Sequence, residues 1–191
     1  VDSLAELPED VRIALPQPGS IQHILLAMAA ERQLGDADLF DRNLVTLNHL
    51  DGMSALLSGS DIQAHFTSPP FLQRELAEGA VLVLDGDEAF GGEYTFIVSV
   101  FSGDFISEYP RAVEALQRAL KRASDWLEAN PAEGAELLAD HFGMNVGEIS
   151  GFLESGDLVF GSEIVGMEAF GEFMHRRGYL DESPSVENLV F

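Results

Sequence analysis

The chain has 191 residues, 46% of them hydrophobic, which is enough for one ordinary domain or two small lobes. Its formal net charge is -23, from 33 acidic and 10 basic residues, and such a surface repels nucleic acid and anionic membranes. The absence of cysteine excludes disulfides, thiolate metal sites and cysteine nucleophiles.

The first half of the chain alternates strand signals with helix signals. Strands are expected where short segments are alternating or continuously apolar, at 11–15, 44–47, 62–66 and 80–84. Helices are expected between them, from the N-cap Ser20 to Gly35, from Asp51 to about Gly59, and through Leu76. This alternation predicts an α/β fold with a mostly parallel sheet covered by helices.

The second half is mostly helical after one apolar segment. Residues 85–92 are expected to form a polar connection, and 95–101 a buried strand. Helix starts follow at Pro110 and at Asn130-Pro131-Ala132-Glu133, where Asn130 is expected as the N-cap. Asn145 with Glu148 repeats this capping pattern, and a last helix ends before Gly178. We therefore expect an α/β ligand-binding lobe at 8–93, then a hinge strand and a mostly helical part at 94–191.

Two connections that follow expected strands carry candidate ligand-binding groups. Pro18-Gly19-Ser20 opens a helix, so its N–H groups and the Ser20 hydroxyl could bind an anion. The same residues are also typical of an ordinary helix cap without a ligand. Phe66-Thr67-Ser68-Pro69-Pro70-Phe71 ends a strand where parallel sheets bind ligands, but it also fits a proline-terminated strand with core phenylalanines. The candidate ligand-binding residues are Gly19, Ser20, Ile21, His49, Phe66, Thr67, Ser68, Pro69 and Phe71.

Motifs for catalysis or metal binding are missing from the sequence. The five histidines form no HExxH or HxH pattern, and each is interpreted first as a structural residue, with His49 at a strand end as the one that could face a cleft. The acidic turn at 85–88 lacks the spacing of a calcium loop. No G-x-S-x-G, Walker or GxGxxG pattern occurs, so we expect no enzyme activity, no metal and no cofactor.

The order of these features resembles the nitrate/sulfonate/taurine-type substrate-binding proteins of ABC importers, a group that includes binders of thiamine-pyrimidine precursors. The likeness lies in LPEDVRIA at 7–14, PGS at 18–20, ALLSGSDIQA at 55–64 leading to TSPP at 67–70, and FISEYPRAV at 105–113 through DWLEANP at 125–131.

The resemblance implies a type 2 periplasmic-binding fold that closes on a small anionic or polar organic solute between two lobes. It implies one complete βα lobe and the C-terminal helices of the other, with the N-terminal part of that other lobe absent from this chain. The expected partners are the solute and a membrane permease, with a homodimer as an alternative way to complete the fold, and the expected location is periplasmic or extracytoplasmic. An enzyme similar to thiamine-pyrimidine synthases and a ligand-sensing module remain alternatives.

Overall fold

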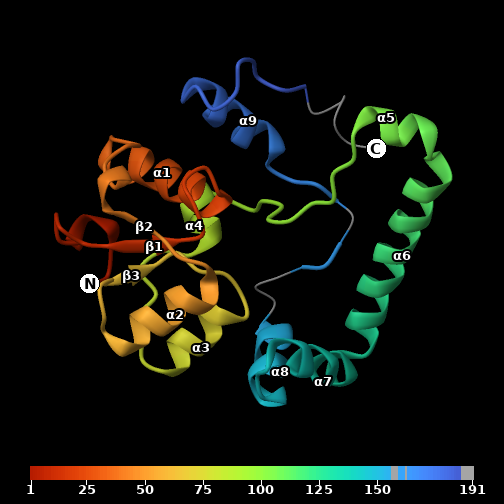
Figure 1. Cartoon of the computed structure of the whole chain (residues 1–191), viewed down its shortest axis with the longest axis horizontal. Helices are drawn as coiled ribbons and strands as arrows, with labels where there is room; N and C mark the ends of the chain where they lie inside the picture. The colour runs from red at the N-terminus through yellow and green to blue at the C-terminus, as the bar shows by residue number, and fades with distance from the viewer. Residues whose placement is uncertain (156–158, 162, 186–191) are drawn as a thin grey trace. The chain divides into compact units, whose positions relative to one another are not determined.

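The structure is a computed structural model that describes residues 1–155, 159–161 and 163–185. It divides into two compact units (Figure 1). Unit 1 comprises Val1–Phe96 together with the chain from Ile164 onward, and unit 2 comprises Ile97–Glu163. The expected boundary at 93/94 lies close to the end of the first segment of unit 1.

Unit 1 contains a small parallel sheet, so the chain has an α/β fold that is mostly helical. The strands are β1 (Ile13–Leu15), β2 (Leu44–Thr46) and β3 (Ala64–His65), in the order β2-β1-β3. Ile13 pairs with Leu44 on one side and with Ala64 on the other. The central strand β1 is entirely buried, which explains its continuous apolar sequence.

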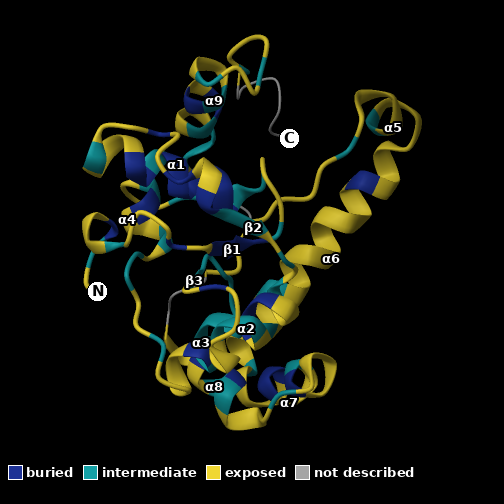
Figure 2. Cartoon of the chain, turned by 60° about the vertical axis from the view of Figure 1, so that its left-hand side comes forward, coloured by how far each residue is buried: buried dark blue, intermediate teal, exposed yellow. Residues whose placement is uncertain are grey.

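Helices lie on both sides of these strands, with α1 (Ile21–Leu34) on one side and α2 (His49–Ser58) and α3 (Phe71–Ala77) on the other (Figures 1 and 2). Short helical turns η1 (Leu4–Glu6) and η2 (Asp41–Asn43) precede β1 and β2. The main core cluster combines buried residues of η1, β1 and α1 with Val11, Phe40 and Ala89. The three β-α pairs expected before residue 78 are confirmed, although the strands are shorter than expected.

The strands expected at 80–84 and 95–101 are wrong, because neither segment is a strand in the structure. A strand needs a neighbour for its N–H and C=O groups, and the three-stranded sheet of the described residues takes in neither segment. Val81 is 66% exposed and Val100 is 83% exposed. The connection expected at 85–92 instead contains α4 (Gly86–Phe90), because the Asp85 carboxylate caps it by accepting the Glu88 N–H at 2.6 Å.

Unit 2 consists of helices α5 (Gly103–Glu108), α6 (Pro110–Ala129), α7 (Pro131–Phe142) and α8 (Val146–Ser155). The capping box expected at the start of α8 is confirmed: Asn145 and Glu148 exchange main-chain to side-chain hydrogen bonds of 3.0 and 2.9 Å. Asn130 is the N-cap residue of α7 and Pro131 opens the helix, as expected, but the Asn130 side chain makes no cap bond and its amide donates to the Trp126 carbonyl at 2.8 Å.

The chain returns to unit 1 through α9 (Met167–Arg176). Phe173 of α9 is buried against Ile24 and Ala27 of α1. Gly178, with φ of 73°, ends this helix as expected: its N–H bonds to the His175 carbonyl and the Tyr179 N–H bonds to the Met174 carbonyl. In the part of the chain that the structure describes, no helix combines the length and apolar character needed to cross a bilayer.

Candidate functional site

The connections that follow the three parallel strands leave the sheet at one edge. They comprise residues 16–20 after β1, 47–48 after β2 and 66–70 after β3. Because the carboxyl ends of parallel strands meet at the same edge, this edge is where ligands bind to open α/β sheets. The sequence-based candidates lie in or next to these connections.

His49 is the residue at which these connections meet. It is the first residue of α2, and its Nε2 atom lies 3.2 Å from the Ser68 hydroxyl. The same Nε2 atom lies 3.4 Å from Nε2 of Gln22, which belongs to the first turn of α1 and is buried. The Phe71 ring stacks on the imidazole, with centroids 5.7 Å apart and an angle of 23°. The structure therefore brings His49, Ser68 and Phe71 together and adds Gln22, which the sequence analysis missed.

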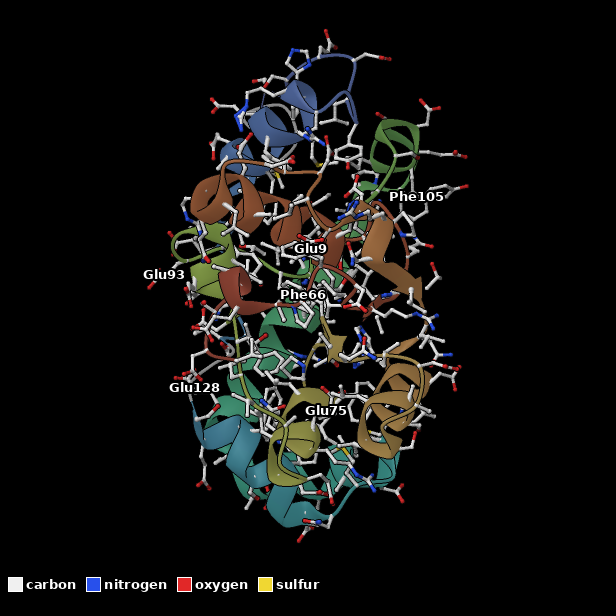
Figure 3. The ribbon with its side chains drawn as sticks, turned by 90° about the vertical axis from the view of Figure 1, so that its left-hand side faces the viewer. Glu9, Phe66, Glu75, Glu93, Phe105 and Glu128 are labelled. Atoms are coloured by element: carbon white, nitrogen blue, oxygen red, sulfur yellow. The ribbon has the colours of Figure 1, made fainter. Side chains whose placement is uncertain are left out.

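A buried histidine–glutamate pair lies next to His49. Nδ1 of His65 is 2.7 Å from Oε1 of Glu75, and the two side chains are 0% and 3% exposed (Figure 3 labels Glu75 on α3). A carboxylate accepts hydrogen bonds, so Nδ1 of His65 donates to Glu75. The His65 ring lies 5.7 Å from the His49 ring and against Gly52 of α2, where a Cβ atom would fall 2.5 Å from Nε2.

Buried polar atoms without a partner concentrate in this region. Among the described residues, five buried side-chain polar atoms lack a hydrogen-bond partner, and four of them are His49 Nδ1, His65 Nε2, Thr67 Oγ1 and Gln73 Oε1. Each such atom costs a folded protein about 1–3 kcal/mol, so their accumulation calls for an explanation. We call His49, His65, Thr67, Ser68, Phe71 and Gln73 the edge site.

The edge site offers neutral hydrogen-bonding groups. Burial, and then the neighbouring His65, lower the pKa of His49, so its ring is neutral at neutral pH and offers one donor and one acceptor. No group of three or more histidine, aspartate or glutamate side chains within the described ranges could hold a metal ion. The arrangement can exchange hydrogen bonds with a polar group beside an aromatic face.

The other candidates take part in loop and core structure. The Gly19 N–H donates to Nδ1 of His23 at 2.9 Å, and the Ser20 hydroxyl caps α1 by accepting the His23 N–H at 3.4 Å. Ile21 and Phe66 pack against the main core cluster. Pro69 is half-buried and joined to Pro70 by a cis peptide bond.

Besides Gln22, the sequence analysis missed His23 and Glu75. A histidine that accepts a main-chain N–H has no local sequence pattern. Glu75 lies on a short helix where a glutamate ordinarily indicates a solvated face, so its burial depends on the tertiary partner His65. The available signal for Gln22 and His23 was their place in the first turn after the Pro18-Gly19-Ser20 connection.

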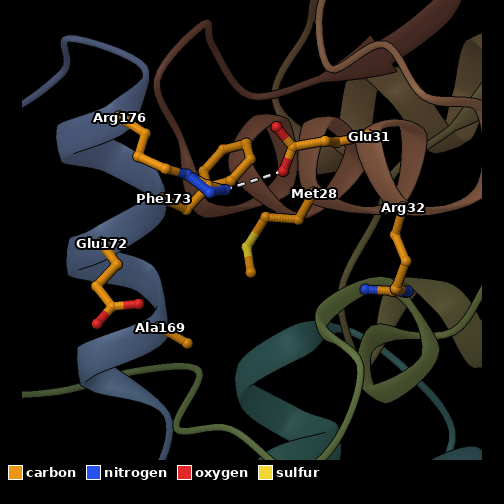
Figure 4. A pocket seen from close by; sticks show the side chains of 7 residues that line it. All are labelled: Met28, Glu31, Arg32, Ala169, Glu172, Phe173 and Arg176. Carbon is orange, nitrogen blue, oxygen red and sulfur yellow. Dashed lines mark hydrogen bonds and ion pairs between the residues drawn. The ribbon is translucent and has the colours of Figure 1, made fainter.

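A separate shallow groove lies between α1 and α9 and shares no residue with the edge site (Figure 4). Its volume is about 380 Å³, and its lining includes Met28, Phe173 and Ala169. Its cations are engaged within the protein: Arg176 pairs with Glu31 at 2.9 Å, and Arg32 donates to carbonyls at the end of α4. The groove is therefore a weaker candidate for ligand binding, because its arginines already hold α9 and α4 to α1.

Comparisons of this chain with protein-family models, with curated proteins and with solved structures gave no match.

Proposed function

We propose that the chain is a solute-binding protein of the type 2 periplasmic-binding kind, which captures a small anionic or polar organic solute for an importer. The observation that carries this proposal is the concentration of unpaired buried polar atoms in the edge site. A bound solute that supplies the missing donors and acceptors would recover much of their cost.

The place of the edge site in the fold supports the same proposal. The site lies at the carboxyl edge of a parallel sheet, and its groups come from separate elements: His49 from α2, Ser68 from the connection after β3 and Phe71 from α3. A polar group of a solute can therefore be held from several sides while the Phe71 ring covers an apolar part. In the cell we place this activity outside the cytoplasmic membrane, with a membrane permease as the partner.

An enzyme is the weaker proposal for this chain. The thiamine-pyrimidine synthases, which resemble the solute-binding family, use a cysteine-rich iron site, and this chain has no cysteine. The Ser68–His49 contact is compatible with nucleophilic chemistry, but Nδ1 of His49 has no acidic partner that would orient the ring. A ligand-sensing module would use the same edge site. A signalling domain fused to this chain would favour that alternative.

A thermal-shift screen tests the proposal with named solutes. Nitrate, taurine, methanesulfonate, acetate and 4-amino-2-methylpyrimidine would each be added to the purified chain, because a ligand that binds only the folded state raises Tm by mass action. Calorimetry would then compare the wild type with Ser68→Ala and with the matched control Ser54→Ala, whose hydroxyl bonds to its own helix at Leu50.

Solute binding at the edge site requires that at least one solute raises Tm, and that Ser68→Ala weakens its binding while Ser54→Ala does not. Equal affinity of both variants would show that the solute binds elsewhere. No Tm shift with any of the five solutes would contradict the proposed ligand class.

A further inference from the structure

Both ring nitrogens of His23 are engaged inside unit 1. Nδ1 accepts the main-chain N–H of Gly19 at 2.9 Å, and Nε2 lies 3.1 Å from a carboxylate oxygen of Asp41. A main-chain N–H can only donate, so Nδ1 must carry a lone pair; Nε2 then carries the proton and donates to Asp41. The buried ring is therefore fixed in one neutral tautomer.

This ring holds the connection between β1 and α1 in place. Gly19 has φ of 80°, a left-handed conformation that favours glycine, and it directly precedes the Ser20 cap of α1. His23 contacts this turn twice, through Nδ1 at Gly19 and through its own N–H at the Ser20 hydroxyl. Asp41 belongs to η2, so His23 also joins the turn to the segment that leads into β2.

The residue next to His23 contacts the edge site. Gln22 precedes His23 in the first turn of α1, and its amide nitrogen lies 3.4 Å from Nε2 of His49. A displacement of the first turn of α1 would therefore change the surroundings of His49 and, through His49, those of Ser68. All of these contacts lie within unit 1 of the chain.

We propose that His23 is a positioning residue for residues 16–20, and that protonation of its Nδ1 atom releases Gly19 and loosens this side of the edge site. The proposal rests on the proposed function for its biological meaning, because the turn borders the proposed solute site. In a protonated ring both nitrogens are donors, so the N–H of Nδ1 would face the N–H of Gly19. Acidification would then favour an altered turn.

The charged and titratable groups near the ring favour release of Gly19 over expulsion of the ring. Asp41 attracts an imidazolium and keeps its contact with Nε2 in either protonation state. Tyr179, which follows α9, presents its ring at 6.2 Å from the His23 ring. The cation nearest in sequence to Tyr179, Arg177, is already paired with Asp38. The proton therefore changes the Gly19 contact while the Asp41 contact persists.

Nuclear magnetic resonance of the whole chain without any solute tests this proposal. Nitrogen-15 shifts of the His23 ring report its tautomer, and amide exchange reports the protection of the Gly19 N–H as a function of pH. At neutral pH we expect Nδ1 to be unprotonated. As the ring becomes protonated, the protection factor of Gly19 should fall at least about fivefold, the factor that corresponds to one ordinary hydrogen bond. The His49 ring signals should shift over the same pH range.

Two substitutions separate the two contacts of the ring. Asparagine places an acceptor near the position of Nδ1, so His23→Asn should keep Gly19 protected and remove the pH transition. Glutamine places its amide near the position of Nε2, so His23→Gln should keep the Asp41 contact and lose the protection of Gly19.

A ring protonated on Nδ1 at neutral pH, or a Gly19 transition that persists in His23→Asn, would overturn the proposal. Equal behaviour of the two variants would do the same. Because no solute is used, these outcomes stay distinct from a failure of the solute screen.

Discussion

Nδ1 of His65 and Oε1 of Glu75 lie 2.7 Å apart, with both side chains closed to solvent. Glu75→Leu should lower the free energy of unfolding by about 1–3 kcal/mol, because it leaves the His65 N–H buried without an acceptor. Glu75→Gln should lower it less, because the amide oxygen can still accept. Urea unfolding measures both, with the exposed Glu78→Gln as the control on the same helix end. Wild-type stability of Glu75→Leu would show that the pair does not stabilise the fold.

Gly52 is required by the position of the His65 ring. A Cβ atom at residue 52 would lie 2.5 Å from Nε2 and 2.7 Å from Cε1 of that ring. Gly52→Ala should therefore destabilise the chain by about 1–3 kcal/mol through overpacking, although alanine is the better helix former.

The double variant Gly52→Ala/His65→Ala isolates this contact. Without the imidazole the added methyl group has room, so Gly52→Ala should be neutral or should stabilise the His65→Ala background by up to about 1 kcal/mol. Unfolding free energies of the four proteins give the coupling between the two positions. Additive effects would mean that the ring does not lie against Gly52.

His49 should make the stability of the chain depend on pH in mildly acidic solution. Burial and then His65 lower its pKa in the folded chain from 6.5, while the unfolded chain keeps the ordinary value. Between these two pKa values the unfolded state binds more protons, so stability falls as the pH drops from about 6.5 toward the folded pKa. His49→Gln should flatten this part of the profile. The exposed His141→Gln of α7, which removes a different histidine, is the control.

Local sequence signals predicted the elements that are stabilised locally. Helix α1 has a serine cap and a left-handed Gly35 at its end, and both signals are visible in the sequence. The strands expected at 80–84 and 95–101 share the apolar composition of β1. Composition does not show whether a neighbouring strand exists. Among the described residues, the second segment makes one backbone hydrogen bond, from the Thr95 N–H to the Val165 carbonyl.

The sequence could predict only those residues of the edge site that lie in or next to the connections after the strands. Alternation along β3 placed His65 and Phe66 on opposite faces, and the structure has Phe66 against the main core cluster and His65 against Gly52. The sequence placed His49 just after a strand, and in the structure His49 opens α2 after the two residues that follow β2. Glu75 and His23 could not be predicted, because each is defined by a partner that is distant or is a main-chain group.

Thr67 should show opposite effects on stability and on binding. Its hydroxyl oxygen is buried without a partner, so Thr67→Val replaces an unsatisfied polar group by a methyl group of nearly the same shape. We expect Thr67→Val to raise the free energy of unfolding of the free chain by about 1 kcal/mol. The same change should weaken binding of whichever tested solute raises Tm, because that solute loses a hydrogen-bonding partner. The exposed Thr46→Val provides a matched control with neither effect.

Urea unfolding and calorimetry on the same samples distinguish a binding role of Thr67 from a structural one. A structural hydroxyl would make Thr67→Val less stable, and the loss of binding would then follow from damage to the fold. A more stable variant with weaker binding has no such explanation, because a better-packed fold does not by itself lower affinity. That combination would show that the unpaired Thr67 oxygen lowers the stability of the free chain but contributes to solute binding. A variant that gains stability and keeps full affinity would show that Thr67 does not contact the solute.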